Sequence, residues 1–114
     1  MPRNAANHLE DMLGSARMIL NYVGDRDEQE FLNDQMLQDA VERRFTIIGE
    51  ALNRLRGDAP ELTRQIRDAA AVRSFRNIIV HQYEAIDGLN VLGIVRDDLP
   101  DFIAVIEALL ESGN

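Results

Sequence analysis

The sequence contains no cysteine and no lysine, and only 5% of its residues are aromatic. The lack of cysteine excludes disulfides, thiol catalysis and thiolate metal ligands. Because only two histidines are present, we expect neither a metal site nor a cofactor. The low aromatic content, together with the absence of sustained polar–apolar alternation, argues against β-strands.

Long apolar runs are also absent. No segment is long enough to span a bilayer, and the N-terminus at Met1–Asn4 lacks the apolar stretch of a signal peptide. We therefore expect a soluble, cytoplasmic protein with no membrane partner. The length of 114 residues, 46% of them hydrophobic, predicts a single helical domain over residues 1–114.

The formal net charge is −8, which argues against non-specific binding to nucleic acid. All twelve basic residues are arginines. Arginine can bind phosphate through two parallel hydrogen bonds, although genomic base composition also explains a chain without lysine. The positions of the arginines therefore matter more than their number.

Apolar residues recur at helical spacing throughout the chain, which predicts an all-α, up-and-down bundle of four to five helices. Five helical regions are expected, at about 5–23, 27–56, 60–68, 70–82 and 89–110. Asn33 and Asp34 interrupt the second region, and Pro100 kinks or restarts the last. The apolar face of the second region is wide enough for two neighbours, either within the bundle or in a second subunit.

Local end signals mark several helix boundaries. Asp27 and Glu30 resemble a capping box. Gly57 suits a C-terminal cap, Asp58 an N-cap and Pro60 an early helical position. Asp87, in the loop before the last region, is a further expected cap.

Residues 73–83 carry the chemistry that the sequence offers. On a helix, about 140° of arc holds one polar group of side chains. This polar arc consists of Arg73, Arg76, Asn77 and His81, together with the apolar Val80. The opposite side of the helix carries Phe75, Ile78, Ile79 and Gln82.

This grouping suits RNA cleavage without a metal. The 2′-hydroxyl must lose a proton to attack phosphorus, and the 5′-oxygen must gain one on leaving. Histidine titrates near neutral pH and can move a proton, whereas arginine stabilises charge that develops on the phosphate. The simpler interpretation is a surface or interface histidine beside solvated arginines.

The segment from Arg76 to Tyr83 resembles the Arg-x4-His-x-Tyr signature of HepT-like proteins in the HEPN superfamily. The resemblance extends in order over nearly the whole chain. It includes residues 31–34, 40–44 and 47–51, which look like the family's long helix, and residues 98–100, which resemble its final stretch. One departure is the run at 69–72, where relatives often carry a Pro-Trp-like entry to the motif helix; this leaves the start of that helix uncertain.

The resemblance implies an endoribonuclease toxin that is active as a homodimer, with both copies of Arg76 and His81 in one cleft. Such a cleft would be locally positive on an acidic body. The implied substrate is tRNA or mRNA. The implied partner is a nucleotidyltransferase antitoxin of the MntA kind, which transfers AMP from ATP to Tyr83 and can form a larger hetero-complex with the toxin. Adenylylation adds bulk and negative charge beside the cleft.

Supporting roles are open for several residues. Arg43, Glu50 and Arg54 share one side of a helix, where they form a salt-bridged face or let Glu50 orient an arginine or His81. Asn77 either contacts the ribose or caps local backbone, and His8 is expected at the surface without a partner. Two other hypotheses compete with the ribonuclease: a non-catalytic dimer that docks a nucleotidyltransferase, and a motif face that only seals a dimer interface.

Overall fold

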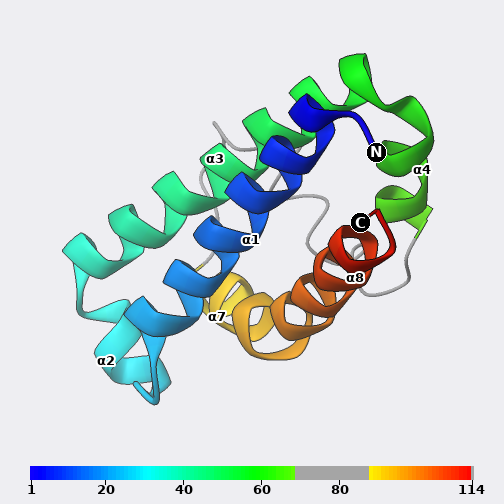
Figure 1. Ribbon diagram of the computed structural model, residues 1–114. Coiled ribbons are helices and arrows are strands. Elements are labelled where there is room, and N and C mark those ends of the chain that lie inside the picture. Colours follow the sequence, from blue (N-terminus) through cyan, green and yellow to red (C-terminus); the bar gives the residue numbers. More distant parts are fainter. Residues whose placement is uncertain (69–87, 114) are drawn as a thin grey trace.

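The computed structural model describes residues 1–68 and 88–113, and every regular element in these two ranges is a helix. The predicted all-α class is therefore confirmed. Figure 1 shows the arrangement. The helices are α1 (Arg3–Val23), α2 (Glu28–Leu32), α3 (Gln35–Asp58), α4 (Pro60–Asp68), α7 (Gly88–Asp97) and α8 (Leu99–Ser112).

Helices α1 and α3 form the centre of the fold and run antiparallel along most of their length (Figure 1). Helix α8 packs against α1, α4 packs against α3, and α7 lies between α2 and α8. Helix α3 contacts α1, α2 and α4. Met36, which belongs to the wide apolar face of the second region, is exposed, so burial of that face on two sides stays a prediction.

One apolar core joins these helices. Its largest fully buried side chains come from five of the six helices: Leu9, Met12, Ile19, Phe31, Phe45, Ile48, Leu55, Ile66, Leu99, Phe102 and Ile106. Burying a side chain of this size contributes roughly 1.5–3 kcal/mol. The core therefore holds both ends of α3 in place.

The local end signals explain most helix boundaries. The capping box is confirmed: Asp27 accepts from the Glu30 amide at 2.8 Å, and the Glu30 side chain accepts from the Asp27 amide at 3.3 Å. Asp34 caps α3 by accepting from the Leu37 amide at 3.0 Å, which explains the interruption between α2 and α3. Pro100 lies in the first turn of α8 and restarts the last helical region instead of kinking it.

The predicted caps at Gly57 and Asp58 are wrong. Helix α3 continues through both residues and ends at Ala59, whose amide donates to the Leu55 carbonyl. Asp58 does not cap α4, because its carboxylate bonds the side chain of His8. A helix can absorb a glycine near its end when tertiary packing holds the last turn, at a cost of about 1 kcal/mol relative to alanine.

Candidate functional site

Most of the predicted site lies outside the described residues. Arg73, Arg76, Asn77, His81 and Tyr83 all fall within 69–87, as do the expected helix at 70–82 and the expected cap at Asp87. Glu50, on α3, is the one residue of the predicted site that the described ranges contain.

Glu50 lies in the middle of α3 and forms a loose ion pair. Its Oε1 is 3.9 Å from Nη1 of Arg43, and the two side chains are 37% and 62% exposed. An exposed pair at this distance contributes at most about 1 kcal/mol to stability. The expected salt-bridged face is thus present between Arg43 and Glu50. Because this ion pair is weak, the Glu50 carboxylate can leave Arg43 and bind another group at little cost.

Arg54 lies one turn beyond Glu50 on the same side of α3. It is exposed and makes no ion pair within residues 1–68 and 88–113. The described part of the structure therefore pairs Glu50 with Arg43 and not with Arg54. An orienting role of Glu50 toward Arg76 or His81 stays a prediction.

His8 has a partner, which corrects the expectation of an unpaired surface residue. Its Nε2 lies 2.8 Å from Oδ2 of Asp58, and its side chain is only 16% exposed. The bond ties the first part of α1 to the last turn of α3. Sequence reasoning missed the pair because fifty positions separate the two residues.

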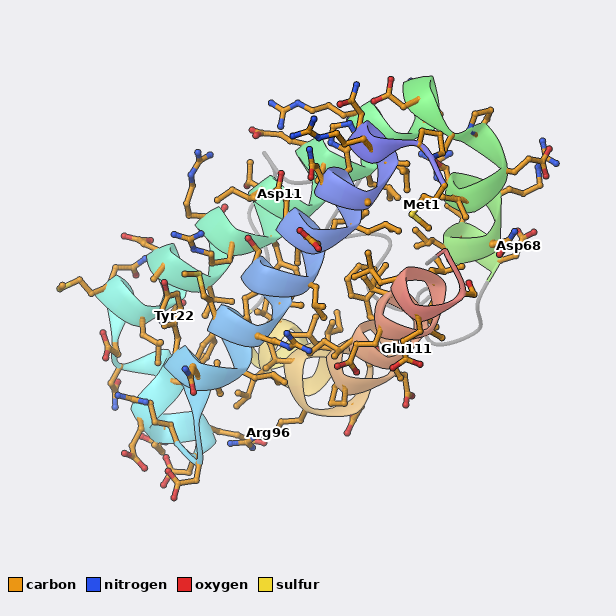
Figure 2. The ribbon with its side chains drawn as sticks, in the orientation of Figure 1. Met1, Asp11, Tyr22, Asp68, Arg96 and Glu111 are labelled. Carbon is orange, nitrogen blue, oxygen red and sulfur yellow. The ribbon has the colours of Figure 1, made fainter. Side chains whose placement is uncertain are left out.

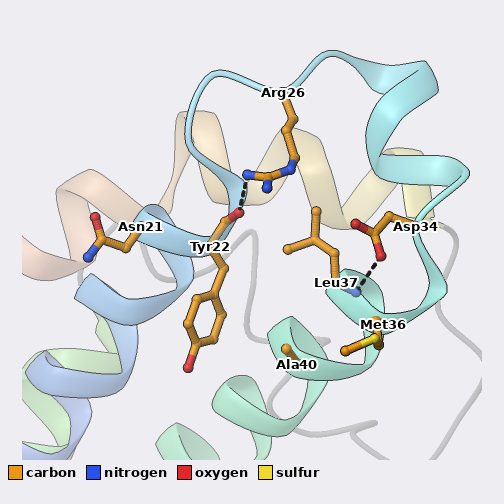
Figure 3. Close-up of a pocket in the computed structure, with 7 residues that line it drawn as sticks. All are labelled: Asn21, Tyr22, Arg26, Asp34, Met36, Leu37 and Ala40. Atoms are coloured by element: carbon orange, nitrogen blue, oxygen red, sulfur yellow. Dashed lines mark hydrogen bonds between the residues drawn. The ribbon is translucent and has the colours of Figure 1, made fainter.

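A shallow pocket of about 390 Å³ lies between the end of α1 and the start of α3 (Figure 3). Its charged groups are engaged locally. The Arg26 guanidinium donates to the Tyr22 carbonyl at 2.7 Å, and Asp34 accepts from the Leu37 amide. These bonds shape the turn between α1 and α3 and leave no arrangement suited to proton transfer, so we assign the pocket no catalytic role.

Within the described ranges, no three histidine, aspartate or glutamate side chains are grouped closely enough to hold a metal ion. Nor does any described helix have the length and hydropathy needed to cross a membrane.

Comparison with known proteins decides the family. A family profile described as "Ribonuclease HepT-like" matches residues 12–109. The chain belongs to the HepT-like ribonuclease family. The match includes α3 with Glu50 and the whole stretch from Arg76 to Tyr83. The resemblance drawn from the motif and the long helix is confirmed at the level of the family.

Individual members of this family match the HepT-like chain over nearly all of its length. "Putative RNase MJ1380" of Methanocaldococcus jannaschii is 33% identical over 92% of this chain and 95% of its own. "Putative RNase MJ0125" of the same organism is 28% identical over 96% of this chain and 93% of its own. "Probable ribonuclease HepT" of Thermococcus cleftensis is 28% identical over 96% of this chain and 98% of its own. No solved structure gives a significant match.

Proposed function

We propose that this HepT-like protein is a metal-independent endoribonuclease toxin that cuts RNA in a cleft between two copies of the chain. The observation that carries the proposal is the family match over residues 12–109, which contains both Arg76 and His81. The names of the relatives, which refer to RNase and to ribonuclease HepT, support RNA as the substrate class. The proposal treats residues 1–114 as one HEPN-like domain.

In the proposed mechanism, the RNA supplies its own nucleophile. The 2′-oxygen attacks the adjacent phosphorus, its proton passes to a base, and the bond to the 5′-oxygen breaks with protonation of that oxygen. The products are a 2′,3′-cyclic phosphate and a 5′-hydroxyl. His81 is assigned the proton transfers, with two copies available in a dimer, and Arg76 stabilises the charge on the phosphorane-like transition state. Arg73 and Asn77 are assigned to substrate binding, and Glu50 to support.

We propose that the toxin is regulated by the transfer of AMP from ATP to Tyr83. In the transfer, the Tyr83 oxygen attacks the α-phosphorus of ATP, the bond to pyrophosphate breaks, and the phenolic proton is lost to a base. A nucleotidyltransferase antitoxin would supply the active site for this step. The bound AMP places a phosphate where the substrate phosphate has to lie, so cleavage stops.

Cleavage of a defined RNA by the purified dimer, with EDTA present, tests the proposal. We expect wild-type protein to cut the RNA, and His81→Ala or Arg76→Ala to reduce the rate by about 10²–10⁴-fold while the dimer persists. His8→Ala is the matched control, because it removes the other histidine and should leave cleavage unchanged. Equal cleavage by wild type and His81→Ala would refute the catalytic assignment.

The same variants separate the competing hypotheses. If the chain is only a docking module, the purified protein does not cleave RNA. Its expression without the antitoxin then causes no growth arrest. A motif face that only seals the interface predicts that Arg76→Ala lowers the melting temperature of the dimer as strongly as it lowers activity.

A further inference from the structure

We propose that the end of the molecule formed by the last turn of α3 and by α4 binds the phosphates of RNA that flank the cleavage site. This inference rests on the proposed function in taking RNA as the ligand. We call this region the basic end and define it by four arginines, Arg54, Arg56, Arg64 and Arg67.

Three of these arginines have no ion-pair partner among the described residues. Arg54 and Arg56 are exposed, Arg67 is half-buried, and none of them makes an ion pair within residues 1–68 and 88–113. Only Arg64 is paired, with Glu61 at 3.2 Å. The neighbouring carboxylate of Asp58 is already bonded to His8 at 2.8 Å. Within the described residues, the basic end therefore holds three guanidinium groups without an ion pair and three carboxylates, of which Glu61 is paired with Arg64, Asp58 is bonded to His8 and Asp68 makes no ion pair.

The opposite end of α3 has the reverse character. Residues 25–34 carry five carboxylates and one arginine, whereas residues 54–68 carry four arginines and three carboxylates. The single arginine of the acidic segment, Arg26, donates to the Tyr22 and Val23 carbonyls. The nearby Arg96 of α7 is likewise engaged, because it donates to the Arg26 carbonyl. The cations at this acidic end hold backbone and are not free for phosphate.

Distance makes the two ends electrostatically independent. Figure 1 shows α2 and α4 at opposite ends of α3. Twenty residues of helix separate Asp34 from Arg54, which corresponds to about 30 Å. At physiological ionic strength the Debye length is about 8 Å. The five carboxylates of residues 25–34 therefore have little effect on the attraction of the basic end for a polyanion.

The chain connects the basic end to the proposed catalytic segment. Figure 2 labels Asp68, where α4 ends, on the side of the molecule away from Arg96. Arg73 follows Asp68 by five residues, so the chain limits their separation to about 18 Å. RNA held at the basic end is thus within about 18 Å of Arg73, which is assigned to substrate binding.

The placement of the arginines favours RNA over an acidic protein surface. Arg54 and Arg56 are two positions apart on α3, so they project about 160° apart around the helix axis. A rigid protein surface cannot easily contact both sides of a helix, but a flexible single strand can wrap around its end. Guanidinium groups also suit phosphate oxygens through paired hydrogen bonds.

The test measures binding separately from cleavage. The probe for binding is a 2′-O-methyl RNA of about twelve nucleotides, which cannot be cut and has a length typical of single-strand binding sites. The variant is R54Q/R56Q/R67Q. Its charge-matched control, Q29E/N33D/Q35E, lowers the net charge equally but at exposed positions of the acidic end. Cleavage is followed in parallel on a dinucleotide, which carries the phosphate to be cut and no flanking phosphates.

We expect R54Q/R56Q/R67Q to weaken binding of the 2′-O-methyl RNA about tenfold or more. The slope of log K against log salt concentration should become shallower by about 0.7 for each lost phosphate contact. Dinucleotide cleavage and the control's affinity should stay within about twofold of wild type. Equal weakening of RNA binding by the two triple variants would overturn the proposal. It would also be overturned if R54Q/R56Q/R67Q kept the wild-type affinity for RNA but were no longer inhibited by an antitoxin. If wild type binds the probe but cuts no RNA, the proposed function fails while the basic end can still stand.

Discussion

The two ends of α3 are built on one core but use their arginines differently. At the acidic end, Arg26 and Arg96 donate to backbone carbonyls and hold the turn between α1 and α2 against α7. At the basic end, Arg54, Arg56 and Arg67 have no ion pair within the described ranges. The comparison shows that an arginine count says little about nucleic-acid binding, since hydrogen bonding decides which arginines are free.

The largest expected effect on the free energy of unfolding concerns the apolar core on which both ends of α3 are built. Phe45 is 1% exposed in the middle of α3. We expect Phe45→Ala to lower the free energy of unfolding by about 3–5 kcal/mol, because it leaves a cavity between helices. Urea denaturation followed by circular dichroism measures this. Met36→Ala, at a side chain that is 84% exposed, should change stability by less than about 0.5 kcal/mol. A similar loss in both variants would contradict the core described here.

The next effect separates structural arginines from free ones. Arg26→Gln should cost about 1 kcal/mol of folding stability, because it removes donors to the Tyr22 and Val23 carbonyls. Arg54→Gln should change stability by no more than about 0.5 kcal/mol. Thermal denaturation of the two variants under identical conditions makes the comparison. If Arg54→Gln destabilises more than Arg26→Gln, the assignment of free and engaged arginines is reversed.

A related effect concerns the hydrogen bond between His8 and Asp58, next to the basic end. The bond between His8 and Asp58 is expected to contribute about 1 kcal/mol. A double-mutant cycle with His8→Ala and Asp58→Ala isolates this coupling. Additive effects of the two substitutions would show that the 2.8 Å contact adds no stability of its own.

The smallest effect on stability concerns Glu50. Glu50→Gln and Arg43→Gln should each change the unfolding free energy by less than about 0.5 kcal/mol, because their pair is exposed and long. Their activities should differ. If Glu50 positions Arg76 or His81, Glu50→Gln lowers kcat with little change in KM, whereas Arg43→Gln retains the wild-type rate. Identical kinetics for the two variants would leave only the salt-bridged face.

The sequence by itself determined the helical class, most helix boundaries and the family. Helical periodicity and the capping box at Asp27 and Glu30 depend on neighbours within a few residues, so local physics decides them. The polar arc of residues 73–83 follows from spacing alone, and its geometry stays a prediction because it lies outside the described residues.

Only the tertiary structure decided the charged pairs that are distant in sequence. His8 bonds Asp58 across fifty positions, Arg96 bonds the Arg26 carbonyl across seventy, and Arg17 bonds Glu107 across ninety. No local pattern specifies such partners, because they meet only once the core has packed α1 against α3 and α8. Local bonds engage Arg26, whereas packing brings Asp58 to His8 and Arg96 to the Arg26 carbonyl, so the two ends of α3 differ for both reasons.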